Sequence, residues 1–200
     1  MPKTPKNRRR GGKGWWLIGG VSAIAILVVV IAVSARSGSA PTYVGPQAVD
    51  ASEDPLDFSV TLYQGSEILG AHSLRFSSLL GDKPIVLNYW ASNCAPCTAE
   101  MPGFEEVWQQ YKDRVLFFGL DVGGFAGFGG PEESKEELKR LGITYPAAQA
   151  PDFNVIMRLQ VKALPSTDFI GADGTIKRSW TGAIGPADLT DLVEDLLQVS

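Results

Sequence analysis

The chain has 200 residues, of which 44% are hydrophobic and 20% are charged, and this composition indicates a folded protein rather than a disordered one. Its 2 cysteines and 1 histidine are too few for a Cys₄ or Cys₂His₂ zinc site, or for an iron–sulfur cluster held by four thiolates, within one chain. The formal net charge of −4 disfavours nucleic-acid binding, so we expect neither a resident metal nor a nucleic-acid partner.

A basic tail and an uncharged stretch open the chain. Residues 1–14 contain six Lys or Arg side chains and no acid, and all 22 acidic residues lie after residue 36. Residues 15–35 carry no charge, and a helix of that length would span about 31 Å, close to the ~30 Å hydrocarbon core of a bilayer. Because basic flanks stay on the cytoplasmic side, we expect a single-pass cell-membrane protein with a cytoplasmic N-terminus and an extracytoplasmic C-terminal domain.

A cleaved signal peptide is the alternative interpretation of the same stretch. Val33, Ser34 and Ala35 resemble a small-residue cleavage site. The apolar run is longer than the about 7–15 residues of a usual signal peptide, which favours a retained anchor. Both interpretations export the remainder of the chain.

The remainder divides into a linker and one folded domain. Residues 36–56 are rich in small residues and proline, which predicts an extended linker before a domain at 57–200. Short apolar or alternating runs predict strands at 58–62, 85–90, 115–120, 166–170 and 175–180. Helical spacing of apolar or charged residues predicts helices at 101–111, at 132–141 and from Pro186 onward.

The order of these elements indicates an α/β fold. A strand–helix–strand crossover implies parallel pairing, and the late hairpin around Ala172 to Gly174 adds antiparallel strands. We therefore expect a mixed central sheet with helices on both faces. On the helix at 132–141, Glu136 and Arg140 are spaced for an i,i+4 ion pair.

Two cysteines stand where a buried strand ends and a helix begins. Cys94 and Cys97 are three residues apart, so their thiols can close a small disulfide ring. A helix N-terminus lowers a thiol pKa from ~8.5 toward about 3.5–7.5, which would make Cys94 the nucleophile. Cys97, one turn further, could then resolve a mixed disulfide. Two buried free thiols, or a passive disulfide that stabilises little, are the alternatives.

At this point the sequence resembles the membrane-anchored TlpA/ResA-like (redoxin) thiol–disulfide oxidoreductases of the thioredoxin superfamily. The resemblance is carried by VLNYWASNCAPCTAEMP at 86–102, ALPST at 163–167 and GADGTI at 171–176. It implies a thioredoxin-like fold that follows a single N-terminal transmembrane helix. It also implies chemistry by a redox-active disulfide, with no bound cofactor.

The resemblance assigns roles on the substrate side of the disulfide. Pro165 matches the cis-proline that faces the disulfide, an isomer found in only about 5–6% of X–Pro bonds, and it would turn the backbone of Leu164 toward a substrate. Asn93 stands where these families usually carry Trp, so it is a candidate substrate contact. Trp90 is either a further substrate contact or a support beneath the site.

Glu100 matches the acid of the CxxCxxE pattern and would exchange a proton with Cys97. A solvated helix acid is the alternative interpretation. The position six residues before the first cysteine holds Asn88 here, which cannot titrate. A glycine-rich segment with Phe125 and Phe128 is either a loop that docks a partner or a flexible surface connection.

The resemblance therefore predicts an extracytoplasmic, monomeric domain that reduces disulfides in exported proteins, apocytochromes c among them, and that a membrane electron donor re-reduces. An oxidant or isomerase in disulfide formation, and a non-catalytic binding module, are the alternatives. A peroxidase of the peroxiredoxin branch would need Thr where this chain has Ala91.

Overall fold

The computed structural model describes residues 54–200. The predicted basic tail, the predicted membrane span at 15–35 and most of the predicted linker lie outside the described residues. Within 54–200, none of the helices combines the length and the apolar character that crossing a bilayer requires. Leu56, the last residue assigned to the linker, is buried in the core.

A mixed sheet forms the centre of the described domain. Its seven strands are β1 (Ser59–Gln64), β2 (Ser73–Arg75), β3 (Ile85–Trp90), β4 (Leu116–Asp121), β5 (Ala147–Gln149), β6 (Ser166–Ile170) and β7 (Ile176–Thr181). They lie in the order β2-β1-β5-β4-β3-β6-β7. β3 and β5 run parallel to β4, while β6, β7, β1 and β2 join by antiparallel pairing. The predicted mixed sheet is confirmed.

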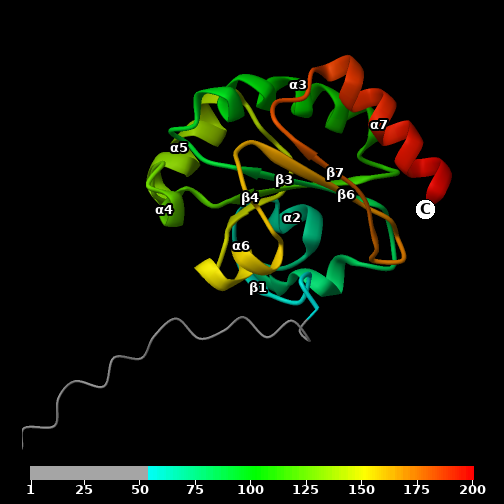
Figure 1. Cartoon of the computed structure of the whole chain (residues 1–200), viewed down its shortest axis with the longest axis horizontal. Coiled ribbons are helices and arrows are strands. Elements are labelled where there is room, and N and C mark those ends of the chain that lie inside the picture. The colour runs from blue at the N-terminus through cyan, green and yellow to red at the C-terminus, as the bar shows by residue number, and fades with distance from the viewer. Residues whose placement is uncertain (1–53) are drawn as a thin grey trace, which may run out of the picture. The chain divides into compact units, whose positions relative to one another are not determined.

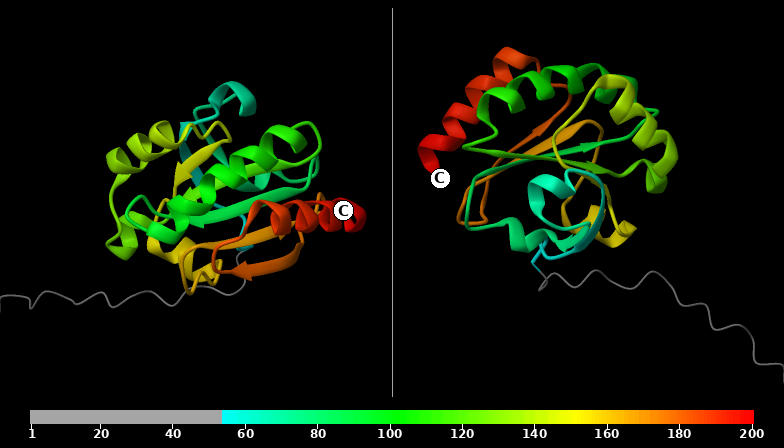
Figure 2. Two further views of the ribbon diagram at one scale, coloured as in Figure 1. Left: turned by 90° about the horizontal axis from the view of Figure 1, so that it is seen from above. Right: turned by 180° about the vertical axis from the view of Figure 1, so that it is seen from behind.

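Helices cover both faces of this sheet. They are α2 (Ser66–Leu69), α3 (Ala95–Tyr111), α4 (Gly123–Ala126), α5 (Pro131–Leu141), α6 (Phe153–Arg158) and α7 (Pro186–Val199), together with the 3₁₀ helix η1 (Phe76–Leu79). Figure 1 shows α3 and α7 on one side of the strands and α2 and α6 on the other. The two turned views in Figure 2 agree with that layering.

Burial explains why the central strands form where the sequence predicts them. All six residues of β3 and all six of β4 are buried, as expected for strands covered on both faces. α3 packs its apolar side, with Met101, Phe104 and Trp108, into the same core. This packing brings the end of β3 and the start of α3 to the edge of the sheet where β4 also ends (Figure 1).

The structure corrects one contact and adds short elements. Arg140 pairs with Glu137, its Nε lying 2.7 Å from Glu137 Oε2, so the predicted Glu136–Arg140 pair is wrong. On a helix both i,i+3 and i,i+4 neighbours lie within reach, and sequence spacing alone does not choose between them. β2, β5, α2 and α4 are each three or four residues long, too short to show a period.

Candidate redox site

The two cysteines occupy the junction that the sequence predicts. Cys94 is the N-cap residue of α3, and its carbonyl oxygen accepts a hydrogen bond of 3.0 Å from the Thr98 N–H. Cys94 and Cys97 form a disulfide, with their Cα atoms 5.3 Å apart. Cys94 is 7% exposed, whereas Cys97 is fully buried. Of the two sulfurs, Cys94 is therefore the one that an incoming molecule can approach.

Glu100 lies one helical turn beyond Cys97 and is only 6% exposed. Asn88 Nδ2 donates to its Oε1 over 2.9 Å, and the Ile184 N–H donates to its Oε2 over 2.8 Å. Asn88 Nδ2 also lies 3.1 Å from Thr167 Oγ1. A buried chain of polar groups thus runs from β6 through β3 to α3 and the segment before α7.

This environment changes the acidity of Glu100. Burial raises the pKa of the Glu100 carboxyl to about 7, although the hydrogen bonds from Ile184 and Asn88 favour the charged form. A carboxyl with such a pKa is close to half ionised at neutral pH, so it can both accept and return a proton. The interpretation of Glu100 as a solvated helix acid is wrong, because the side chain is buried.

The loop before β6 carries the predicted cis-proline. The Leu164–Pro165 peptide bond is cis, as the resemblance implies. Ser166 Oγ donates to the carbonyl oxygen of Ala163 over 2.8 Å, and the Gly182 N–H donates to that of Pro165 over 2.9 Å. These bonds connect the loop to β6 and to the end of β7.

A cavity of about 410 Å³ lies beside Cys94. Leu164 and Asn93 line it together with Cys94, so the structure brings these three predicted residues together. Trp90 is fully buried, so it has no surface with which to touch a substrate. Its assignment as a substrate contact is therefore corrected, and the alternative, that Trp90 supports the site from within the core, stays a prediction.

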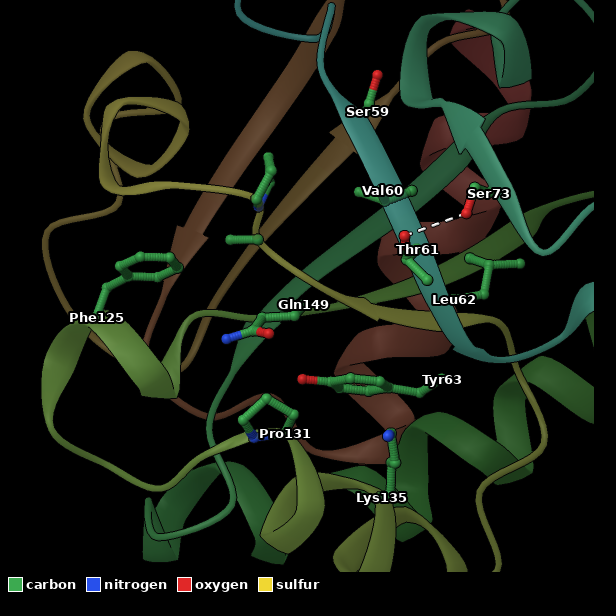
Figure 3. A pocket seen from close by; sticks show the side chains of 12 residues that line it. Ser59, Val60, Thr61, Leu62, Tyr63, Ser73, Phe125, Pro131, Lys135 and Gln149 are labelled. Carbon is green, nitrogen blue, oxygen red and sulfur yellow. Dashed lines mark hydrogen bonds between the residues drawn. The ribbon is translucent and has the colours of Figure 1, made fainter.

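A second cavity, of about 440 Å³, shares Phe125 with the first, and no cysteine lines it. Figure 3 shows Tyr63 of β1 in it, close to Lys135 and Gln149, with Phe125 across the space. The Lys135 ammonium lies 5.6 Å from the centre of the Tyr63 ring. The two cavities are of similar size, and redox chemistry belongs to the one that Cys94 borders.

Sequence reasoning missed several residues around the site. Asn88 appeared only as a group that cannot titrate, whereas it is a hydrogen-bond donor to Glu100. Phe153, the first residue of α6, lines the cavity beside Cys94 although no motif marks it. Among residues 54–200 there is no group of three or more His, Cys, Asp or Glu side chains able to hold a metal ion.

Comparison with known proteins decides the family. The model of the AhpC/TSA family matches residues 54–179. The chain belongs to the AhpC/TSA family. Its relatives include the thiol-disulfide oxidoreductase ResA of Geobacillus kaustophilus, which is 29% identical over 178 residues. That match covers 88% of this chain and 95% of the relative. ResA of Bacillus subtilis is 25% identical over 171 residues, covering 83% of this chain and 87% of the relative.

Solved structures support the fold of this AhpC/TSA protein. DsbF of Mycobacterium tuberculosis gives a TM-score of 0.60 at 24% identity, covering 74% of this chain and 99% of its own. A secreted disulfide oxidoreductase of Mycobacterium tuberculosis, homologous to DsbE of E. coli, gives a TM-score of 0.59 at 23% identity. That match covers 71% of this chain and 98% of the other. The domain has the thioredoxin-like fold, and the protein is a ResA/TlpA-like thiol–disulfide oxidoreductase, a type that works through a redox-active disulfide without a further cofactor.

Proposed function

We propose that this oxidoreductase reduces disulfides in exported proteins, with Cys94 as the nucleophile and Cys97 as the resolving thiol. The unequal burial of the two cysteine residues supports this division of roles, because of the two only Cys94 borders a cavity that a substrate can enter. The position of Cys94 at the N-cap of α3 also favours its thiolate, since the helix dipole and free N–H groups stabilise a negative charge there.

The proposed reaction consists of two displacements. The Cys94 thiolate attacks one sulfur of the substrate disulfide, forms a bond to it, and expels the other sulfur as a thiolate that takes a proton from water. Cys97 then loses its proton and attacks the Cys94 sulfur, which releases the second substrate sulfur as a thiol. Two electrons pass to the substrate, and the Cys94–Cys97 disulfide remains until an external dithiol reduces it.

Glu100 would serve the second displacement as the group that accepts the Cys97 proton. Its place one turn from Cys97 and its pKa of about 7 suit that role. Leu164 would present its backbone to the substrate, with Pro165 setting the course of that loop, and Asn93 would contact the substrate at the cavity margin. All of these groups belong to α3, to the turn before it or to the loop before β6, near the point where β3 ends.

The proposed setting is the outer face of the cell membrane. Residues 15–35 would anchor the chain with the N-terminus in the cytoplasm, and the domain would work outside as a monomer. A membrane-bound dithiol donor would return the electrons. Apocytochromes c awaiting haem attachment are the proposed exported substrates, in keeping with the resemblance to the ResA-like group.

Reduction of insulin by dithiothreitol tests the chemistry. We expect the full-length chain to accelerate insulin precipitation, and the Cys94→Ser variant to show only the background rate. The Cys97→Ser variant should also fall to background while accumulating a covalent adduct on Cys94. Activity that survives in the Cys94→Ser variant would refute the proposed mechanism.

Two further measurements test direction and substrate. Related proteins span about −270 to −120 mV, and a potential below roughly −150 mV is expected for a reductant, whereas a higher value would assign the protein to disulfide formation. Expression of Cys97→Ser in native membranes should trap substrates as mixed disulfides. Recovery of apocytochromes c would support a maturation role, and their absence among the adducts would refute it.

A further inference from the structure

Three phenylalanine side chains gather at the cavity beside Cys94. Phe125 and Phe128 come from the glycine-rich segment around α4, and Phe153 comes from the start of α6. They are 39%, 45% and 53% exposed, which is unusual for so large an apolar side chain, and all three line the same cavity. We call these three residues the aromatic rim.

The segment that carries Phe125 and Phe128 is bonded to the redox site. The carbonyl oxygen of Phe128 accepts a hydrogen bond of 3.0 Å from the Asn93 N–H, and Ser92 Oγ donates to the same oxygen over 3.3 Å. Asn93 immediately precedes Cys94. The φ of Gly129 is +104°, and a Cβ there would collide with Ser92 Oγ, so the segment packs directly on the turn that presents Cys94.

A buried carboxyl group holds the other end of this segment, at the start of α4. Asp121, the last residue of β4, is fully buried, and its Oδ1 accepts a hydrogen bond of 2.8 Å from the Gly123 N–H at the start of α4. Its Oδ2 accepts one of 2.9 Å from the Tyr63 hydroxyl. Held at both ends, the segment forms a wall of the cavity, so its interpretation as a flexible surface connection does not fit these contacts.

The composition of the cavity defines what can occupy it. Apart from Asn93 and Lys162, the residues that line it are apolar, and Lys162 is the one charged side chain among them. A volume of about 410 Å³ accepts a large side chain together with a stretch of backbone. Because Cys94 borders the cavity, an occupant that exchanges with its sulfur must carry a sulfur of its own, as the cysteine of a polypeptide does.

We propose that the aromatic rim is a specificity subsite that binds a large apolar side chain beside the reacting cysteine of an unfolded polypeptide substrate. This inference rests on the proposed function, because it concerns the substrate of the Cys94 reaction. The lone Lys162 favours segments without a basic residue next to that cysteine. The protein would thus select cysteines within apolar segments, which are exposed in exported chains before they fold.

Two synthetic peptides test the subsite. They have equal length and charge and one cysteine each, flanked by Phe in one peptide and by Ser in the other. Each cysteine is carried as a mixed disulfide with thionitrobenzoate. The dithiol form of the full-length chain, held in phosphatidylcholine nanodiscs, attacks the peptide sulfur and expels coloured thionitrobenzoate. Cys97 then releases the peptide thiol, so the protein dithiol supplies both electrons.

We expect the Phe peptide to react about tenfold faster than the Ser peptide, since binding one large apolar side chain in a pocket gives discrimination of that order. Phe128→Ala and Phe153→Ala should each bring the ratio of the two rates toward one. Met157→Ala is the matched control for Phe153→Ala: Met157 lies on the same helix α6, is 51% exposed and does not line the cavity, so the ratio should be kept.

The outcomes separate the subsite from the proposed function. Equal rates for both peptides, or a tenfold ratio that persists in Phe128→Ala and Phe153→Ala, would overturn the subsite while leaving the oxidoreductase chemistry intact. Release from neither peptide would count against the proposed function itself. Equal rates together with a concentration-dependent dimer that Phe153→Ala abolishes would assign the cavity to a second copy of the chain, and would also overturn the proposal.

Discussion

Two regions of the domain are each built around a buried carboxyl group. Glu100 lies on α3 beyond the disulfide and receives hydrogen bonds from a side chain and a backbone N–H, those of Asn88 and Ile184. Asp121 lies at the end of β4, just before α4. It likewise accepts two hydrogen bonds, one from the side-chain hydroxyl of Tyr63 and one from the backbone N–H of Gly123.

The position of each carboxyl group, rather than its chemistry, separates their roles. Burial raises the pKa of both, to about 7 for Glu100. Glu100 shares a helix face with Cys97, in keeping with its proposed role as the acceptor of the Cys97 proton. Asp121 is bonded to the start of the segment that carries the aromatic rim, so it holds that wall in place.

The largest expected effect is on the resolving step. Glu100→Gln removes the proposed proton acceptor, so release of substrate from the Cys94 mixed disulfide should slow about 100-fold at pH 7. Stopped-flow mixing of the dithiol protein with an excess of a disulfide substrate, followed to the release of the second substrate thiol, measures this rate. Glu106→Gln, an exposed acid on the same helix, is the matched control and should leave the rate unchanged.

The pH dependence of that rate distinguishes proton transfer from a structural effect. In the unmodified protein the resolving rate should rise as Glu100 ionises near pH 7, and this inflection should disappear in Glu100→Gln. A variant that is slower by the same factor at every pH would show that Glu100 only supports the fold.

The second prediction concerns stability against pH. The pKa of Glu100 is about 7 in the folded protein and 4.5 ordinarily, so between these values the folded state binds more protons than the unfolded state. The contribution of Glu100 to the free energy of unfolding should therefore be most favourable below pH 4.5. This contribution should fall by up to about 3 kcal/mol as the pH rises through 7. Urea denaturation at several pH values measures this loss.

The difference between the unmodified protein and Glu100→Gln isolates the contribution of this one group. We expect the decline between pH 4.5 and pH 7 to be much smaller in the variant. An equally steep decline in both proteins would assign the pH dependence to other carboxyl groups, Asp121 first among them, because burial raises its pKa as well.

A smaller effect is expected at the other carboxyl group. Asp121→Ala leaves the Tyr63 hydroxyl and the Gly123 N–H without their acceptor, which should lower the free energy of unfolding by about 2 kcal/mol. The same variant should reduce the preference for the Phe peptide, because the wall of the cavity is no longer fixed. Asp82→Ala, at an exposed position, should change neither quantity. Unchanged peptide selectivity in Asp121→Ala would separate Asp121 from the substrate cavity.

The central strands and the cysteine pair could be predicted because their signals are local. The apolar runs at β3 and β4 and the CxxC pair at the start of α3 each lie within a few consecutive residues. The stripe of Met101, Phe104 and Trp108 likewise predicts the buried face of α3 from its spacing alone.

The polar network and the aromatic rim could not be predicted, because their members are distant in sequence. Tyr63 reaches Asp121 across 58 residues, and the Ile184 N–H reaches Glu100 across 84. Their meeting depends on the order of strands in the sheet, which places β1 and β4 on either side of β5. Phe153 belongs to a helix of six residues, which shows no period that would mark it as part of a site.

Cys94 is the more exposed of the two cysteines and the proposed nucleophile, and alkylation of the reduced protein measures how far their reactivities differ. A limiting amount of iodoacetamide at pH 7, followed by peptide mapping of the singly modified protein, compares the two thiols under one condition. We expect Cys94 to be modified at least about tenfold more often than Cys97, because its thiolate is favoured and it alone of the two borders the cavity. Equal modification of both cysteines, or preferential modification of Cys97, would contradict it.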